Sequence, residues 1–194
     1  MAGLISALRF AATGMWVIFC LVWLAAAFGV KRNVVSRPAW ARLPLRVAVV
    51  AVVLLVFARR LNRDLLLASV AVLLASPAVA VIGLLLCAGG IAFAVWARTA
   101  IGANWGMPMT LKHGHELVTT GPYAYVRHPI YSGVLLAMLG SVLVISMLWA
   151  VVLLLNALQF IYAARKEEQL MLKSFPAQYA AYMQRTKMLI PFVL

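Results

Sequence analysis

The sequence is poor in charged residues, and acidic residues are almost absent from it. Charged residues make up 11% of the 194 positions and hydrophobic residues 66%, whereas soluble domains contain about 25% charged and about 45–50% apolar residues. This composition excludes a water-soluble globule. Only 4 acidic residues oppose 17 Lys and Arg, which gives a net charge of +13. Because the basic residues lie between long apolar runs rather than in one patch, they indicate a polytopic membrane protein and no nucleic-acid partner.

Cysteine is also scarce. The two cysteines, Cys20 and Cys87, lie inside apolar runs, where a thiol behaves as a small hydrophobic group. They exclude a disulfide framework and a cysteine-based metal site, and we expect no bound metal. The first apolar run resembles a signal peptide, but it is long enough to span a membrane and further spans follow it, so we expect it to be retained.

The lengths of the apolar runs predict an all-α polytopic membrane protein. A helix needs about 20 apolar residues to cross the hydrocarbon core. The runs that meet or approach this length are residues 10–30, 43–58 and 77–97. We interpret residues 65–75 as an interfacial or re-entrant piece. Residues 130–161 form either one long tilted helix or a hairpin of two short spans that turns near residues 140–146.

The distribution of basic residues favours the hairpin. With two short spans, 13 of the 17 Lys and Arg fall on one side of the membrane, whereas a single crossing divides them almost evenly. Basic residues mark the cytoplasmic side. We therefore predict about five transmembrane helices in a bacterial-type plasma membrane, with the N-terminus outside and the C-terminus in the cytoplasm.

The chain divides into N-terminal transmembrane helices, residues 1–97, and a C-terminal region, residues 98–194, that holds the polar variety. A polar loop over 98–129 precedes the hairpin, and an amphipathic tail over 162–194 follows it on the same face. The loop contains Tyr123, Arg127 and His128, and the tail contains the adjacent acids Glu167 and Glu168.

A structural interpretation of these residues stays open. In it the tyrosines anchor the membrane boundary, Arg127 binds headgroup phosphate, and His128 caps a helix. Arg165 then pairs with Glu168 at the helical spacing i, i+3.

Several separated blocks of the C-terminal half resemble the isoprenylcysteine carboxyl methyltransferase family, within a superfamily that also holds phospholipid N-methyltransferases. The blocks lie in the family's order over residues 98–192: GANW at 102–105, GHELV at 114–118, GPY at 121–123, RHPIYSG at 127–133, and EE at 167–168 followed by Phe175, Tyr179 and Tyr182. The resemblance implies a membrane enzyme that uses S-adenosylmethionine. The cofactor-binding residues that it implies are His115, Glu116, Leu117, Val118, Tyr123, His128, Pro129, Tyr131 and Glu167.

The chemistry of methyl transfer suggests three catalytic candidates, Arg127, Arg165 and Glu168. A carboxylate nucleophile needs a cation to orient it. An amine nucleophile needs a base to remove its proton, and His128 and Glu168 are the candidates for that base. Relatives that act on isoprenylcysteine carry an Arg four residues before the cofactor-binding Glu, but this chain has Ala163 there. Arg165 lies about 200° around the helix from Ala163 and does not replace that Arg. Another lipid or isoprenoid acceptor is therefore as well supported.

Two other functions remain open. Membrane lipid or sterol reductases that use NADPH share a similar Arg-His-Pro-x-Tyr region, although no strand-bounded G-x-G-x-x-G unit occurs here. A non-enzymatic membrane protein is the other alternative, but no ionisable residue lies in the middle of a span, as an ion pathway would require. The expected partners are a lipophilic small-molecule substrate and membrane lipids, and the sequence carries no signal for oligomeric state.

Overall fold

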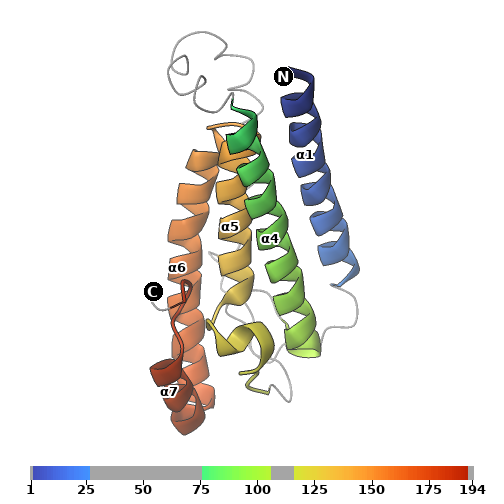
Figure 1. The fold of residues 1–194 in the computed structure, drawn as a ribbon. Helices are drawn as coiled ribbons and strands as arrows, with labels where there is room; N and C mark the ends of the chain where they lie inside the picture. The colour runs from blue at the N-terminus through green and yellow to red at the C-terminus, as the bar shows by residue number, and fades with distance from the viewer. Residues whose placement is uncertain (1, 27–75, 106–115, 192–194) are drawn as a thin grey trace.

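The computed structural model describes residues 2–26, 76–105 and 116–191, and this part of the chain is helical (Figure 1). Its α-helices are α1 (Ala2–Ala25), α4 (Pro77–Ile101), α5 (Pro129–Val144), α6 (Trp149–Ser174) and α7 (Pro176–Arg185). Two short 3₁₀ turns, Gly102–Asn104 and Gly121–Ala124, lie between α4 and α5 in the chain. The described residues form no sheet beyond one isolated parallel bridge between Val126 and Lys187. The predicted all-α class is therefore confirmed.

The predicted hairpin is present as α5 and α6, but it turns at residues 145–148, slightly later than the predicted 140–146, because α5 continues to Val144. Its second helix continues to Ser174, past residue 161, where the sequence predicted that it ends. The residues in between are mostly good helix formers, and the next proline in the chain is Pro176, at the start of α7. As a result, Glu167 and Glu168 lie on the same continuous helix as the apolar residues before them.

Two described helices, α1 and α4, are long and apolar enough to cross a membrane, and α5 is a shorter apolar helix. The helix predicted over 77–97 begins at Pro77 as expected and ends at Ile101. The helix predicted over 10–30 begins earlier, at Ala2, and ends at Ala25. The predictions for residues 43–58 and 65–75 lie outside the described residues.

Helices α4 and α5 lie side by side because glycines face each other along their contact (Figure 1). A Cβ atom added to Gly90 would lie 2.4 Å from the backbone nitrogen of Ala137, and one added to Gly140 would lie 2.4 Å from that of Cys87. Small residues of this kind let membrane helices approach closely, because apolar side chains gain little by leaving lipid for protein. This contact fixes the position of the start of α5.

The adjacent glycines Gly89 and Gly90 provide a matched test of this contact. A Cβ at Gly89 meets no atom within 4 Å, whereas a Cβ at Gly90 collides with α5. Overpacking costs about 1–3 kcal/mol, and Ala in place of an exposed helical Gly gains about 1 kcal/mol. We predict that Gly90→Ala lowers the thermal unfolding temperature in detergent while Gly89→Ala leaves it unchanged or raises it. Equal responses of the two variants would contradict the close contact.

Candidate functional site

The site begins where the polar loop meets α5. Gly121 has a φ of 61°, a conformation that favours glycine, and Pro122 follows it in the 3₁₀ turn. Pro129 is the first residue of α5, where its missing N–H costs no hydrogen bond. Arg127 and His128 are therefore held between a tight turn and a helix start.

A segment near the C-terminus, residues 186–189, runs alongside Arg127 and His128, and we call it the C-terminal strap. The backbone N–H of Arg127 donates to the carbonyl of Lys187 at 2.9 Å, and that of His128 donates to Met188 at 3.1 Å. The hydroxyl of Ser132 donates to the carbonyl of Leu189 at 2.5 Å. The strap thus holds the backbone of Arg127 and His128 in place through hydrogen bonds.

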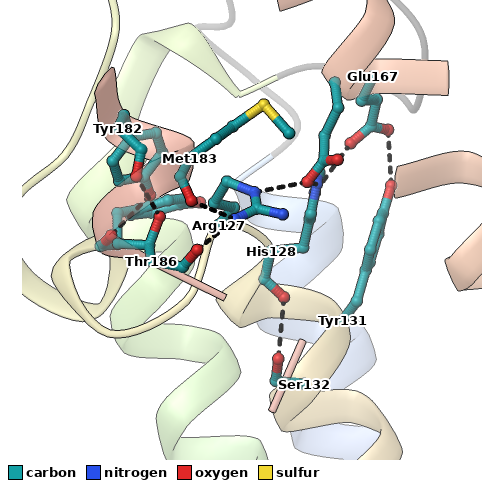
Figure 2. A network of polar contacts seen from close by, with 10 residues as sticks. Arg127, His128, Tyr131, Ser132, Glu167, Tyr182, Met183 and Thr186 are labelled. Carbon is teal, nitrogen blue, oxygen red and sulfur yellow. Dashed lines mark hydrogen bonds and ion pairs between the residues drawn. The ribbon is translucent and has the colours of Figure 1, made fainter. Parts of the chain in front are cut away.

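The Arg127 guanidinium is buried and held by three partners (Figure 2). Its Nε lies 2.6 Å from Oε1 of Glu168 on α6. Its Nη1 donates to the carbonyl of Thr186, and to that of Met183 at 3.4 Å. Arg127 therefore ties the start of α5 to α6, to the end of α7 and to the strap.

His128 lies between the two acids of α6. Its Nδ1 is 3.3 Å from Oε2 of Glu167, and its Nε2 is 3.5 Å from Oε1 of Glu168. Burial alone lowers the pKa of His128, but the hydrogen bonding and negative charge of Glu167 and Glu168 outweigh it and hold the pKa above its ordinary value. Burial likewise raises the pKa of Glu168, and His128 and Arg127 outweigh it and lower that pKa. The cluster therefore places Arg127 and His128 against the carboxylates of Glu167 and Glu168.

Glu167 is oriented from its other side by Tyr131 of α5. The Tyr131 hydroxyl donates to Oε1 of Glu167 at 2.7 Å (Figure 2). The Tyr131 ring lies parallel to the rings of His128, at 5.5 Å, and of Phe160, at 4.5 Å. These contacts hold the Glu167 carboxylate in one place.

Two tyrosines of α7, Tyr179 and Tyr182, are buried beside the cluster. The Tyr182 hydroxyl donates to the Tyr123 carbonyl at 2.6 Å. Burial raises the pKa of Tyr182 to about 12 and also raises those of Tyr123 and Tyr179. The raised pKa values keep all three phenols neutral, so they do not act as bases.

A cavity of about 450 Å³ lies beside this cluster, and its two ends differ in polarity. We call one the polar end, lined by Glu116, Tyr123, Arg127, His128, Tyr131 and Glu167. We call the other the apolar end, lined by Trp16 and Phe19 of α1, Val134 and Met138 of α5, and Asn156 and Phe160 of α6. The cavity can therefore hold a polar group and a hydrophobic chain together.

Most of the residues predicted from the sequence meet at this cavity. Leu117 and Val118 line it together with the residues of the polar end. Pro129 and Glu168 are buried beside it and do not line it. His115 lies outside the described residues.

Arg165 is placed differently from the other catalytic candidates. It is exposed on α6 and does not line the cavity. Its predicted pairing with Glu168 is wrong, because Glu168 faces inward and is bound by Arg127. The predicted side-chain cap by His128 is also absent from the start of α5.

Several lining residues were not predicted from the sequence. Asn104 is buried, and its Oδ1 accepts a hydrogen bond from the backbone N–H of Glu116 at 3.4 Å, which positions the loop over 116–118. The aromatic residues Trp16, Phe19 and Trp23 of α1 also line the cavity. Their i, i+3, i+7 spacing was visible in the sequence, since it places them on one helix face.

Comparisons with known proteins support one family. Residues 78–178 match the model of the phospholipid methyltransferase family. Among curated proteins, the chain is 32% identical over 94 residues to the cobalt-zinc-cadmium resistance protein CzcN of Cupriavidus metallidurans, covering 47% of this chain and 43% of CzcN. It is 41% identical over 44 residues to the uncharacterized protein YpbQ of Bacillus subtilis, covering 23% of this chain and 26% of YpbQ. The chain thus spans less than half the length of the curated relatives it matches.

A solved structure has a similar fold. The eukaryotic intramembrane Ras methyltransferase ICMT (isoprenylcysteine carboxyl methyltransferase) matches with a TM-score of 0.57 and 24% identity. The match covers 82% of this chain and 55% of that one. This likeness concerns the fold.

The charge cluster predicts a pH optimum of stability. Because folding raises the pKa of His128, this residue stabilises the folded state fully below its ordinary pKa of 6.5. That stabilisation is lost as pH rises through the raised pKa. Because folding lowers the pKa of Glu168, this residue stabilises the folded state fully above its ordinary pKa of 4.5. That stabilisation is lost as pH falls through the lowered pKa. Thermal unfolding in detergent should therefore show greatest stability between about pH 4.5 and 6.5. The decline above that range should disappear in His128→Gln, and an unchanged decline would contradict the arrangement.

Proposed function

The chain belongs to the phospholipid methyltransferase family, and on that premise we propose that it is an integral membrane enzyme that transfers a methyl group from S-adenosylmethionine to a lipophilic acceptor. The reaction is of the isoprenylcysteine carboxyl O-methyltransferase type. The observation that carries the proposal is the cavity with one polar and one apolar end, since it suits a polar cofactor beside a hydrophobic acceptor. The resemblance found in the sequence is confirmed at the level of family and fold.

The residues of the polar end fit the cofactor by their chemistry. The Glu167 carboxylate, fixed by Tyr131 and His128, can accept hydrogen bonds from ribose hydroxyls or an amino group. The faces of Tyr123 and Tyr131 can contact the adenine or the sulfonium, and backbone groups over 116–118 can bind the amino-acid end. S-adenosylmethionine supplies a methyl group bound to a positively charged sulfur. The protein aligns the acceptor with that methyl group and excludes water.

The charges favour a carboxylate acceptor over an amine. An amine must lose a proton to a base before it can react, but His128 is paired with two carboxylates that favour its protonated form. Glu168 is bound by Arg127 and does not line the cavity, so it is not placed to remove that proton. Arg127 lines the cavity, and its Nη2 is the guanidinium nitrogen not engaged by Glu168, Met183 or Thr186. We assign Arg127 to orienting the acceptor carboxylate.

We further propose that the polar end faces the cytoplasm of a bacterial-type plasma membrane. Most of the basic residues lie on that side in the hairpin topology. The region 98–194 then supplies the polar groups, and α1 supplies part of the apolar wall. The proposed partners are a lipophilic small molecule and the surrounding lipids.

The proposed function predicts which cofactor the protein binds. Calorimetric titration of the folded protein in detergent should show saturable binding of S-adenosylhomocysteine and no binding of NADPH. The protein's thermal unfolding transition serves as the control for folding. Binding of NADPH alone would instead assign the protein to the membrane reductases.

The two adjacent acids should respond differently to substitution. Glu167→Gln removes a charged acceptor from the cavity and should weaken S-adenosylhomocysteine binding about tenfold or more. Glu168→Gln should change binding much less, but it leaves the buried Arg127 without its counter-charge and should lower stability by up to about 3–5 kcal/mol. Calorimetry and thermal unfolding separate the two effects. Equal small effects on binding would remove Glu167 from the cofactor site.

A further inference from the structure

One polar side chain lies at the apolar end of the cavity and has no role in the methyl transfer described above. Asn156 of α6 lines the cavity one helical turn before Phe160 and one turn after Val152, which packs with Met138 and Val134. These neighbours are hydrocarbon, thioether and aromatic groups, which offer an amide no hydrogen bond of ordinary strength. Asn156 therefore has to find its partners elsewhere.

Only part of the Asn156 amide is bonded to the described residues. Its Nδ2 donates to the Val152 carbonyl one turn earlier in α6, at 2.8 Å. Within the described chain, its Oδ1 accepts no hydrogen bond. Other polar groups at this depth are bonded to one another: Trp16 Nε1 donates to Ser141 Oγ at 2.9 Å, and Ser141 donates to the Ala137 carbonyl at 2.9 Å. Among the described residues, the oxygen of Asn156 therefore has no donor partner.

Asn156 and Glu167 are separated by a known distance along α6. The two residues are eleven positions apart on one continuous helix, which corresponds to about 16 Å along the axis and about 20° around it. Both therefore lie on the same face of α6, and both line the cavity. A single elongated molecule that reacts near Glu167 can reach Asn156 with its far end.

We propose that Asn156 is a specificity-determining residue that recognises a hydrogen-bond donor, a hydroxyl or an amide N–H, at the end of the acceptor far from the reacting carboxylate, at a level of α6 about 16 Å from Glu167. The proposal rests on the methyltransferase function proposed above. The acceptor is then a chain with a polar group at its far end. A plain hydrocarbon chain leaves Oδ1 unpartnered, and a site built around a hydrogen bond rejects a ligand that lacks its partner.

A matched pair of acceptors tests this assignment. The probes are farnesylthioacetic acid and its analogue with a hydroxyl on the terminal isoprene unit, each assayed with labelled S-adenosylmethionine and the full chain in detergent. The wild type should show a kcat/KM about tenfold or more higher for the hydroxylated probe. Asn156→Leu should abolish this preference, since leucine is compatible with an apolar helix but has no group that accepts a hydrogen bond.

Leu158→Ala is the matched control, because Leu158 lies on the exposed face of α6 and does not line the cavity. It should keep the wild-type preference. Equal rates for the two probes in the wild type, or a preference that survives in Asn156→Leu, overturn the assignment of Asn156.

Titration with S-adenosylhomocysteine on the same preparations separates this inference from the proposed function. A folded wild type that does not bind S-adenosylhomocysteine overturns the proposed function itself. A wild type that binds it but methylates neither probe overturns this acceptor class alone.

Discussion

The buried ion pair between Arg127 and Glu168 is the interaction on which the rest of the site depends. A buried charge without a partner is costly, and removing one member of such a pair costs about 3–5 kcal/mol. This pair joins the start of α5 to α6, and the other bonds of Arg127 add the end of α7 and the strap. Three distant parts of the sequence are therefore fixed around one guanidinium. His128 and Glu167 extend the cluster to the cavity.

The helices bring this cluster to the edge of an apolar environment. The glycine contact between α4 and α5 fixes where α5 begins, and α6 extends past the apolar hairpin without a break. One face of α6 therefore carries Asn156, Phe160 and Glu167 in succession along the cavity. That face therefore supplies both polar and apolar lining residues, and Met171 follows Glu167 on it. The fold thus gives one cavity access to both kinds of chemistry.

The sequence was sufficient to predict the helical class, the hairpin and the importance of the two blocks that meet at the cavity. Glu167 and Glu168 drew attention because acids are scarce, but their different roles depend on which face of α6 turns inward. The strap could not be predicted, because its bonds to Arg127 and His128 are backbone contacts without a side-chain signature. Arg165 was a catalytic candidate by its position alone, and its exposure on α6 became visible only in the fold. The end of α6 was misplaced because loss of apolar character does not end a helix that lacks a breaker.

The most direct test is an experimental structure of the protein with S-adenosylhomocysteine bound. We expect the ligand to occupy the polar end of the cavity, with the Glu167 carboxylate within hydrogen-bonding distance of its ribose or amino group. Arg127 and Glu168 should remain paired beneath it. A ligand that binds elsewhere without contact to Glu167, or an Arg127 that leaves Glu168 to hold it, would contradict the central role of the cluster.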